Sequence, residues 1–206
     1  MEHEKKDFQA KIVTFTEVYD LSQKISRQIT DSSISFDVVV GIARGGVTPA
    51  RLFCDFLNVD TLTSLQIRHY TSGAQQLEDV KITDPVGVNI RDKNVLLVDD
   101  VNDSGKTLSA ATDQIKSLEP ALLKSAVIHE KENTQIKADF VGEYLKEWKW
   151  LIYQWAVTED ILEFLNKDDM LDVPEEKALN HLRKKYKLTI DPDLYQHILE
   201  MKNNYL

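Results

Sequence analysis

The sequence predicts an α/β protein in which helices flank a mainly parallel sheet, with a small hood and a C-terminal helical appendage. Short apolar runs rich in β-branched residues alternate with segments of helical periodicity, an order typical of parallel strands joined by right-handed crossovers. From residue 170 onward only helical signals follow. With 206 residues, 42% hydrophobic and 29% charged, the chain can form one large domain with an appendage and is neither disordered nor fibrous.

The alternating elements occupy the body of the chain. The first helix is predicted from apolar residues at helical spacing, which are Val18, Leu21, Ile25 and Ile29. Buried strands are expected at 36–42, 63–70, 94–98 and 125–129, and further helices at 47–57 and 106–118. Residues 71–93 are polar, and we expect them to form a long excursion rather than part of the core.

The tail, residues 170–206, is predicted to hold two helices. One begins near Pro174 and the other at Asp191-Pro192, a cap followed by a proline. Their apolar stripes are Leu179, Leu182 and Tyr186 in the first helix and Leu194, Ile198 and Met201 in the second. Either the body of the same chain or the tail of a second subunit could cover these stripes. Because six basic and six acidic residues leave the tail neutral, we expect a homodimer whose interface includes residues 174–202.

The composition excludes several classes of function. The formal net charge is −9, which argues against nucleic-acid binding as the main activity, because such binding requires a basic face. A single cysteine, Cys54, excludes an intrachain disulfide and a thiolate zinc cluster, and its apolar neighbours predict a buried, inert thiol. Residues 1–7 are charged, unlike a signal peptide, and no apolar run is long enough to span a bilayer. We therefore expect a cytoplasmic protein that does not bind membranes.

The most informative segment is the strand at 94–98 and the loop that follows it. The strand ends in Asp99 and Asp100, and a loop with hydroxyl side chains and Gly105 leads into a helix. Backbone N–H groups at a helix N-terminus, at the carboxyl edge of a sheet, bind anions. Asp100 stands where a Walker A loop requires a glycine, which argues against a nucleoside-triphosphate loop. An acidic turn that caps the helix is the alternative, but three acids within five residues, Asp103 being the third, favour a bound cation or sugar hydroxyls.

Residues 95–107 closely resemble the phosphoribosyl-pyrophosphate signature of type I phosphoribosyltransferases, and the ending 103–107 is especially similar to that of hypoxanthine-guanine phosphoribosyltransferases. The resemblance implies that Asp99 and Asp100 hold the ribose hydroxyls and a magnesium ion with its shell. It also implies that Asp103 lies near the five-membered ring of a purine and acts in catalysis. The 5′-phosphate would be cradled by the next four residues, Ser104, Gly105, Lys106 and Thr107.

Two further segments fit the same resemblance. Gly41–Gly46 follows the first strand, as the pyrophosphate loop of the family does, although a plain glycine turn is the alternative. The implied pyrophosphate contacts are Arg44, Gly45 and Gly46. This loop often carries a cis peptide in the family, which would lie here at Ala43–Arg44. Arg68 is a further candidate pyrophosphate contact, at the start of a mobile lid over 70–93.

The base pocket is predicted from two places. Trp150–Trp155 resembles a segment of microbial and archaeal purine phosphoribosyltransferases in which the first tryptophan, here Trp150, stacks on the base and the next residue, Leu151, offers backbone groups. Gln154 departs from that pattern, and two core tryptophans on a strand are the alternative. Lys131 follows a strand where related 6-oxopurine enzymes donate to the exocyclic oxygen, and a surface lysine is the alternative.

The resemblance covers roughly residues 10–165. We predict a phosphoribosyltransferase core over 1–169, with a hood at about 132–157, and an appendage over 170–206. The implied reaction transfers phosphoribosyl from phosphoribosyl pyrophosphate (PRPP) to a purine base, with 6-oxopurines favoured and magnesium as cofactor, and yields a nucleoside monophosphate for purine salvage. An adenine phosphoribosyltransferase and a non-catalytic PRPP-sensing regulatory protein are the alternatives.

Overall fold

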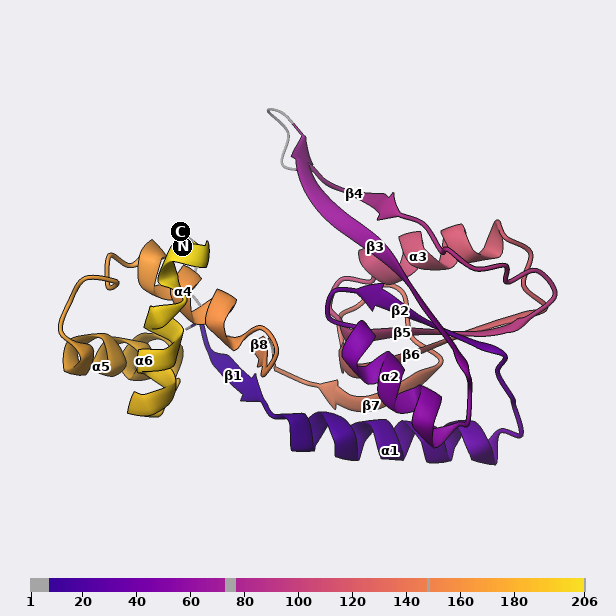
Figure 1. The fold of residues 1–206 in the computed structure, drawn as a ribbon, viewed down its shortest axis with the longest axis horizontal. Coiled ribbons are helices and arrows are strands. Elements are labelled where there is room, and N and C mark those ends of the chain that lie inside the picture. The colour runs from indigo at the N-terminus through magenta and orange to yellow at the C-terminus, as the bar shows by residue number, and fades with distance from the viewer. Residues whose placement is uncertain (1–7, 73–76, 148, 206) are drawn as a thin grey trace, which may run out of the picture. The chain divides into compact units, whose positions relative to one another are not determined.

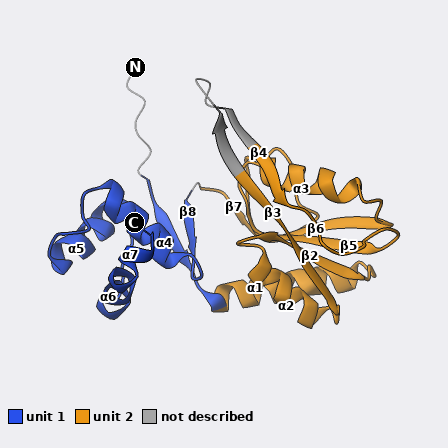
Figure 2. Cartoon of the chain, turned by 45° about the horizontal axis from the view of Figure 1, so that its top comes forward, with its two compact units in different colours: residues 1–15, 148–206 blue, residues 16–147 orange. Residues whose placement is uncertain are grey.

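The computed structural model of the chain describes residues 8–72, 77–147 and 149–205. They form two compact units, each with its own sheet: unit 2 comprises residues 16–147, and unit 1 comprises residues 1–15 together with 148–206 (Figures 1 and 2). The charged segment 1–7, in which no signal peptide was expected, lies outside the described residues.

The described part of unit 2 forms a six-stranded sheet with the order β4-β3-β2-β5-β6-β7 (Figure 1). All neighbouring strands run parallel except β3 and β4, so the prediction of a mainly parallel sheet is confirmed. The strands are β2 (Val38–Ala43), β3 (Thr61–Ser72), β4 (Leu77–Asp84), β5 (Asn94–Asn102), β6 (Leu122–Lys131) and β7 (Phe140–Leu145). Because β3 and β5 lie on opposite sides of β2, the strand order reverses there. Such a switch point is where open α/β sheets bind ligands.

Helices cover both faces of this sheet, which explains why β2 and β5 are nearly continuous apolar runs. The helices are α1 (Phe15–Asp31), α2 (Val47–Phe56) and α3 (Lys106–Lys116). On one face, Leu108 and Ile115 of α3 share a core with Val40 and Leu97. On the other face α2 packs on β2, where a Cβ added to Gly41 would lie 3.2 Å from Ala50 Cβ. The glycine thus lets the helix approach the strand closely.

The prediction that residues 71–93 form a polar excursion outside the core is wrong for the first part of this range. Strand β3 continues to Ser72 and pairs antiparallel with β4, and Val80 and Ile82 of β4 pack against the core under α3. Charged residues between these apolar ones are typical of a half-buried edge strand. Because of them, this segment was predicted to be a polar loop instead of the strand β4. Residues 73–76 of the predicted lid lie outside the described residues.

Unit 1 combines two short strands with four helices among its described residues. Strand β1 (Ala10–Val13) pairs in parallel with β8 (Trp150–Tyr153). The helices are α4 (Val157–Lys167), α5 (Glu175–Tyr186), α6 (Pro192–Glu200) and α7 (Lys202–Tyr205). The two predicted tail helices are confirmed, and the Asp191 side chain caps α6 by accepting a hydrogen bond from the Asp193 N–H at 3.0 Å. Helix α4 was not predicted.

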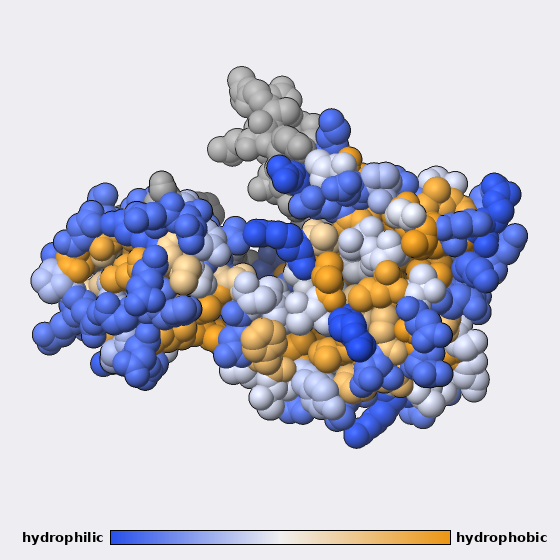
Figure 3. All heavy atoms as spheres, viewed as in Figure 1, coloured by the Kyte–Doolittle hydropathy of each residue, from blue (hydrophilic) through white to orange (hydrophobic). Residues whose placement is uncertain are grey.

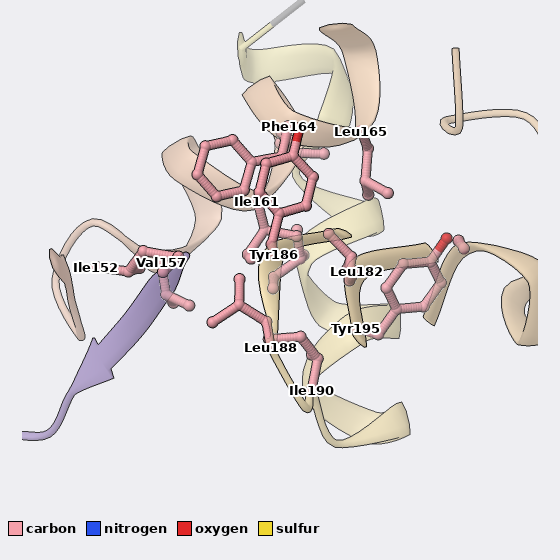
Figure 4. Packing of buried hydrophobic residues seen from close by; sticks show 14 residues of the cluster. Ile152, Val157, Ile161, Phe164, Leu165, Leu182, Tyr186, Leu188, Ile190 and Tyr195 are labelled. Carbon is pink, nitrogen blue, oxygen red and sulfur yellow. The ribbon is translucent and has the colours of Figure 1, made fainter. Parts of the chain in front are cut away.

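The tail, residues 170–206, belongs to unit 1 and contributes to its core. Leu182 and Ile198, from the two predicted stripes, are fully buried in a cluster with Ile161 and Leu165 of α4. Figure 4 shows Leu182 beside residues of α4 in this cluster. The stripes are therefore covered within the chain, and the argument that they need a second subunit no longer holds. The predicted hood range is divided as well, since β7 belongs to the sheet of unit 2 and β8 to unit 1.

Polar side chains form most of the surface of unit 1 that is visible in Figure 3. Among the described residues, no helix is both long and apolar enough to cross a membrane. Cys54 is buried, as predicted, and burial raises the pKa of its thiol while Arg51 opposes the shift. A raised thiol pKa leaves little thiolate, in agreement with an inert cysteine.

Candidate active site

The two predicted phosphate-binding loops meet at the switch point of the sheet. Strands β2 and β5 are parallel neighbours, with Gly41 opposite Val98, so the loops that follow them emerge at the same edge. A Cβ added to Gly45 would lie 2.0 Å from Asp100 Oδ2, and one added to Gly46 would lie 2.4 Å from the Val98 carbonyl oxygen. Only glycine fits at position 46, where the obstacle is backbone, whereas a Cβ at position 45 would require the Asp100 carboxylate to move. The backbone of the predicted pyrophosphate loop therefore lies directly against the acidic end of β5.

The two acids lie within β5, beyond the expected end of that strand. Asp99 is buried, and its Oδ1 accepts a hydrogen bond from the Asp100 N–H at 2.9 Å. Burial, followed by the charge of Asp100, raises the pKa of Asp99 well above its ordinary range. Asp100 is half-buried and accepts from the Val101 N–H at 2.8 Å. The pair offers carboxylate oxygens to a cation or to sugar hydroxyls.

The phosphate loop, residues 104–107, leads into α3. Gly105 has φ +88°, a left-handed conformation that favours glycine, and a Cβ there would lie 2.8 Å from the Ile136 nitrogen. The side chains of Ser104 and Lys106 are exposed. A cavity of about 380 Å³ adjoins the loop; its lining includes Ser104, Gly105, Lys106, Ser109, Gln135 and Ile136. A helix N-terminus beside an open cavity with hydroxyl and ammonium groups suits a phosphate.

A buried polar network, which the sequence did not reveal, holds the strap, residues 134–138, against this loop. The Asn102 amide donates to Glu130 Oε2 at 2.9 Å and to the Ile136 carbonyl at 2.7 Å, and the Ala138 N–H donates to the same Glu130 oxygen at 2.8 Å. Glu130 and Asn102 are both buried. The available signal was an asparagine and a glutamate at the ends of two apolar strands, since buried polar groups need hydrogen-bonding partners.

Asp103 and Lys131 form an ion pair, with Lys131 Nζ 2.6 Å from Asp103 Oδ2. Lys131 is the last residue of β6, and its side chain is only 10% exposed, so the alternative of a surface lysine is wrong. Asp103 is more open, with 55% of its side chain exposed. The fold thus joins the predicted catalytic acid and the predicted base-binding cation, which are 28 residues apart in the chain.

Comparison with known proteins identifies the family. Residues 10–159 match the model of the phosphoribosyl transferase domain, which is more than half of the chain. The chain belongs to this family. It is 31% identical over 130 residues to a hypoxanthine-guanine phosphoribosyltransferase of Aquifex aeolicus, an alignment that covers 58% of this chain and 71% of that protein.

Two further relatives agree with this assignment, one of them a solved structure. The crystal structure of a purine phosphoribosyltransferase from Pyrococcus horikoshii superposes with a TM-score of 0.63 and 27% identity, covering 72% of this chain and 95% of that one. A bifunctional TilS/HprT protein of Listeria monocytogenes is 28% identical over 144 residues, which cover 66% of this chain and 22% of that protein. This chain therefore spans about a fifth of the Listeria protein.

The basic residues predicted to contact pyrophosphate lie on the neighbouring strands β2 and β3 of this phosphoribosyl transferase fold, Arg44 just after the end of β2 and Arg68 within β3. Arg44 follows β2, and its side chain is exposed. The peptide between Ala43 and Arg44 is cis, as the family resemblance implied. Arg68 is exposed on β3, two residues after Gln66, which pairs with Ala43. The strand register therefore places both residues close to the end of β2 from which the predicted pyrophosphate loop emerges.

The predicted base-stacking residues belong to unit 1. Trp150 begins β8, is 40% exposed, and donates from Nε1 to Asp160 Oδ1 at 3.0 Å. Leu151 is half-buried and pairs with Lys11. Gln154, the departure from the family pattern, accepts a hydrogen bond from the Phe15 N–H at 2.6 Å. The roles of Trp150 and Leu151 at a base stay predictions.

Proposed function

We propose that this protein is a purine phosphoribosyltransferase that transfers phosphoribosyl from PRPP to a 6-oxopurine and releases pyrophosphate, a reaction of purine salvage. The observation that carries the proposal is the ion pair of Asp103 and Lys131 beside the phosphate loop. It joins a carboxylate, which can accept the proton of a purine ring nitrogen, and an ammonium, which can donate to an exocyclic oxygen. The name of the Aquifex relative, a hypoxanthine-guanine phosphoribosyltransferase, supports a 6-oxopurine, and that of the Pyrococcus relative supports a purine.

PRPP would bind along the edge where the two loops meet. Its 5′-phosphate would accept hydrogen bonds from residues 104–107, at the start of α3. Its pyrophosphate would lie on the backbone of Gly45 and Gly46, with charge from Arg44 and Arg68. The ribose hydroxyls would donate to the carboxylates of β5.

The donor set of Asp99 and Asp100 fits a magnesium ion. Asp99 is buried beside a second acid, so a cation there would relieve the repulsion between them. Carboxylate oxygens are also the protein ligands that Mg²⁺ prefers. We propose that Asp99 and Asp100 hold the ion, either directly or through water and ribose hydroxyls. When bound, it would neutralise charge on the departing pyrophosphate.

In the reaction, the bond between ribose C1 and the pyrophosphate oxygen breaks, and a bond from C1 to a purine nitrogen forms. The leaving oxygen keeps the electron pair, and Asp103 accepts or shares the proton of the purine nitrogen. A 6-oxopurine placed between Asp103 and Lys131 would replace their mutual contact with two hydrogen bonds. Adenine presents an amino group instead, which would leave Lys131 without an acceptor at a cost of about 1–3 kcal/mol.

A turnover assay with PRPP, magnesium and four bases tests this function. We expect hypoxanthine, guanine or xanthine to be converted to the monophosphate faster than adenine. Faster turnover of adenine would contradict the role of Lys131 and favour the adenine enzyme. Tight binding of PRPP with no turnover of any base would favour the PRPP-sensing alternative.

The role of Asp103 is tested by Asp103→Asn, which keeps the shape of the side chain and removes its charge. We expect the turnover number to fall by about 10²–10⁴-fold, because general-base assistance is lost, while the affinity for PRPP changes little. Asp60→Asn, at an exposed aspartate of the same unit, is the matched control. A turnover number that stays at the wild-type level in Asp103→Asn would contradict the assignment.

A further inference from the structure

A second group of ligating side chains lies where α1, β6 and β7 meet in unit 2. It consists of Glu17 in the first turn of α1, His129 in β6 and Glu143 in β7. His129 and Glu143 are register partners on adjacent parallel strands. The His129 side chain is fully buried, whereas those of Glu17 and Glu143 are 26% and 46% exposed. The buried imidazole thus meets two carboxylates that reach the surface.

The distances within this group are those of ligands that share an ion. His129 Nε2 lies 3.4 Å from Glu17 Oε1 and 3.6 Å from Glu143 Oε2, and the three ligand atoms all lie within 4.8 Å of one another. A direct N–H···O hydrogen bond is shorter, about 2.7–3.2 Å. Two ligands of a tetrahedral zinc ion, with bonds of about 2.0–2.1 Å, lie about 3.4 Å apart.

We propose that Glu17, His129 and Glu143 bind a zinc ion, with water in the fourth position. Imidazole and carboxylate are ordinary zinc ligands, and two carboxylates balance the charge of the dication. Magnesium prefers an all-oxygen set and would be held by Asp99 and Asp100 instead. The zinc joins three elements of unit 2 and ties the first turn of α1 to the sheet. Its role is therefore structural and separate from the transfer reaction.

Calorimetric titration of the full chain with zinc chloride, in excess magnesium chloride to occupy the acids of β5, tests the site. We expect one equivalent of zinc to bind. Glu143→Gln should weaken binding at least tenfold, because loss of even an outer partner of a metal site costs about 10–100-fold in affinity. Glu132→Gln, at an exposed glutamate of the same unit, should bind zinc like the wild type. No binding of a single equivalent would overturn the proposal, and so would affinity unchanged in both Glu143→Gln and Glu17→Gln.

Cobalt(II) substitution gives a readout that is independent of activity. We expect the strong visible absorption of four-coordinate cobalt in the wild type and its loss in Glu17→Gln, with circular dichroism confirming that the variant is folded. A cobalt spectrum that is weak and octahedral, or unchanged in Glu17→Gln, would overturn the site. The group would then be a polar cluster of His129 and two glutamates without a metal ion.

Discussion

Two aspartates with little exposed surface, Asp168 in unit 1 and Asp99 in unit 2, are in opposite electrostatic situations. The Asp168 carboxylate contacts His181 Nε2 at 2.7 Å and Tyr186 OH at 2.7 Å, and it also pairs with Lys185. Burial alone would raise the pKa of Asp168, but these donors outweigh it and lower the pKa to about 2. For Asp99 both burial and the neighbouring Asp100 act in the same direction and raise the pKa.

The difference lies in where the compensating charge comes from. The tail supplies donors to Asp168, so the fold itself stabilises the ionised carboxylate. These hydrogen bonds in turn stabilise the folded state. The charge beside Asp99 is that of another acid, so its ionised form needs compensation from a ligand. A perturbed acid in an open site of this kind is a candidate functional residue, whereas a satisfied one is structural.

The largest effect on the contrast between the two aspartates is expected when the chain is ended after Asp169. This removes the donors of Asp168 and the buried Leu182, Tyr195 and Ile198, each worth about 1.5–3 kcal/mol of burial. We expect unit 1 to lose hydrogen-exchange protection while unit 2 keeps its own. Sedimentation of the truncated chain tests the predicted homodimer. If the truncated chain is still a folded dimer, the dimer interface lies outside the tail. Persistent protection of α4 would contradict the shared core.

Asp99→Asn addresses the functional side of the comparison. We expect turnover to fall by about 10²–10³-fold, as when a group that stabilises the transition state is lost. We expect the melting temperature to stay the same or rise, because an amide avoids burying a charge beside Asp100. Full activity with lower stability would show that Asp99 is structural.

Asp168→Asn addresses the structural side. The lowered pKa corresponds to about 2 kcal/mol of stability at neutral pH, which the variant should lose as a lower melting temperature of unit 1. Asp169→Asn is the matched control, since Asp169 is exposed and has φ 56°, a conformation that asparagine tolerates. An equal loss in both variants would contradict a specific role for the network.

The smallest expected effect is the change with pH in the difference between the melting temperatures of the wild type and Asp168→Asn. The pKa of Asp168 in the folded chain is below its ordinary value of 3.8, so its contribution is fully present above about pH 4 and is lost as the pH falls towards 2. Thermal melts of the wild type and Asp168→Asn should therefore converge as the pH falls from 4 to 2. A difference that persists at pH 2 would assign the loss to packing instead of charge.

Contiguous patterns in the sequence were sufficient for the phosphate loop and most elements of the sheet. The strand, the acids, Gly105 and the start of α3 follow one another within residues 95–107, so local chemistry specifies them. The cap and proline at Asp191 likewise predicted the start of α6 from neighbouring residues alone. Edge strand β4 was not predicted, because charged residues interrupt its apolar period. Helix α4 was not predicted either, because the segment just before it was interpreted only as a base-binding motif.

Tertiary structure alone decided which distant groups meet. The register of β5 against β6 sets Asp103 near Lys131 and Asn102 opposite Glu130, and a shift of one residue would separate them. Packing of α5 and α6 on α4 decided that the tail covers its own apolar stripes. Strand register and helix packing depend on contacts between residues far apart in the chain, which periodicity and motif spacing do not encode. The sequence by itself therefore determined the phosphate loop and its chemistry. The tertiary structure determined which distant residues of the chain lie beside that loop.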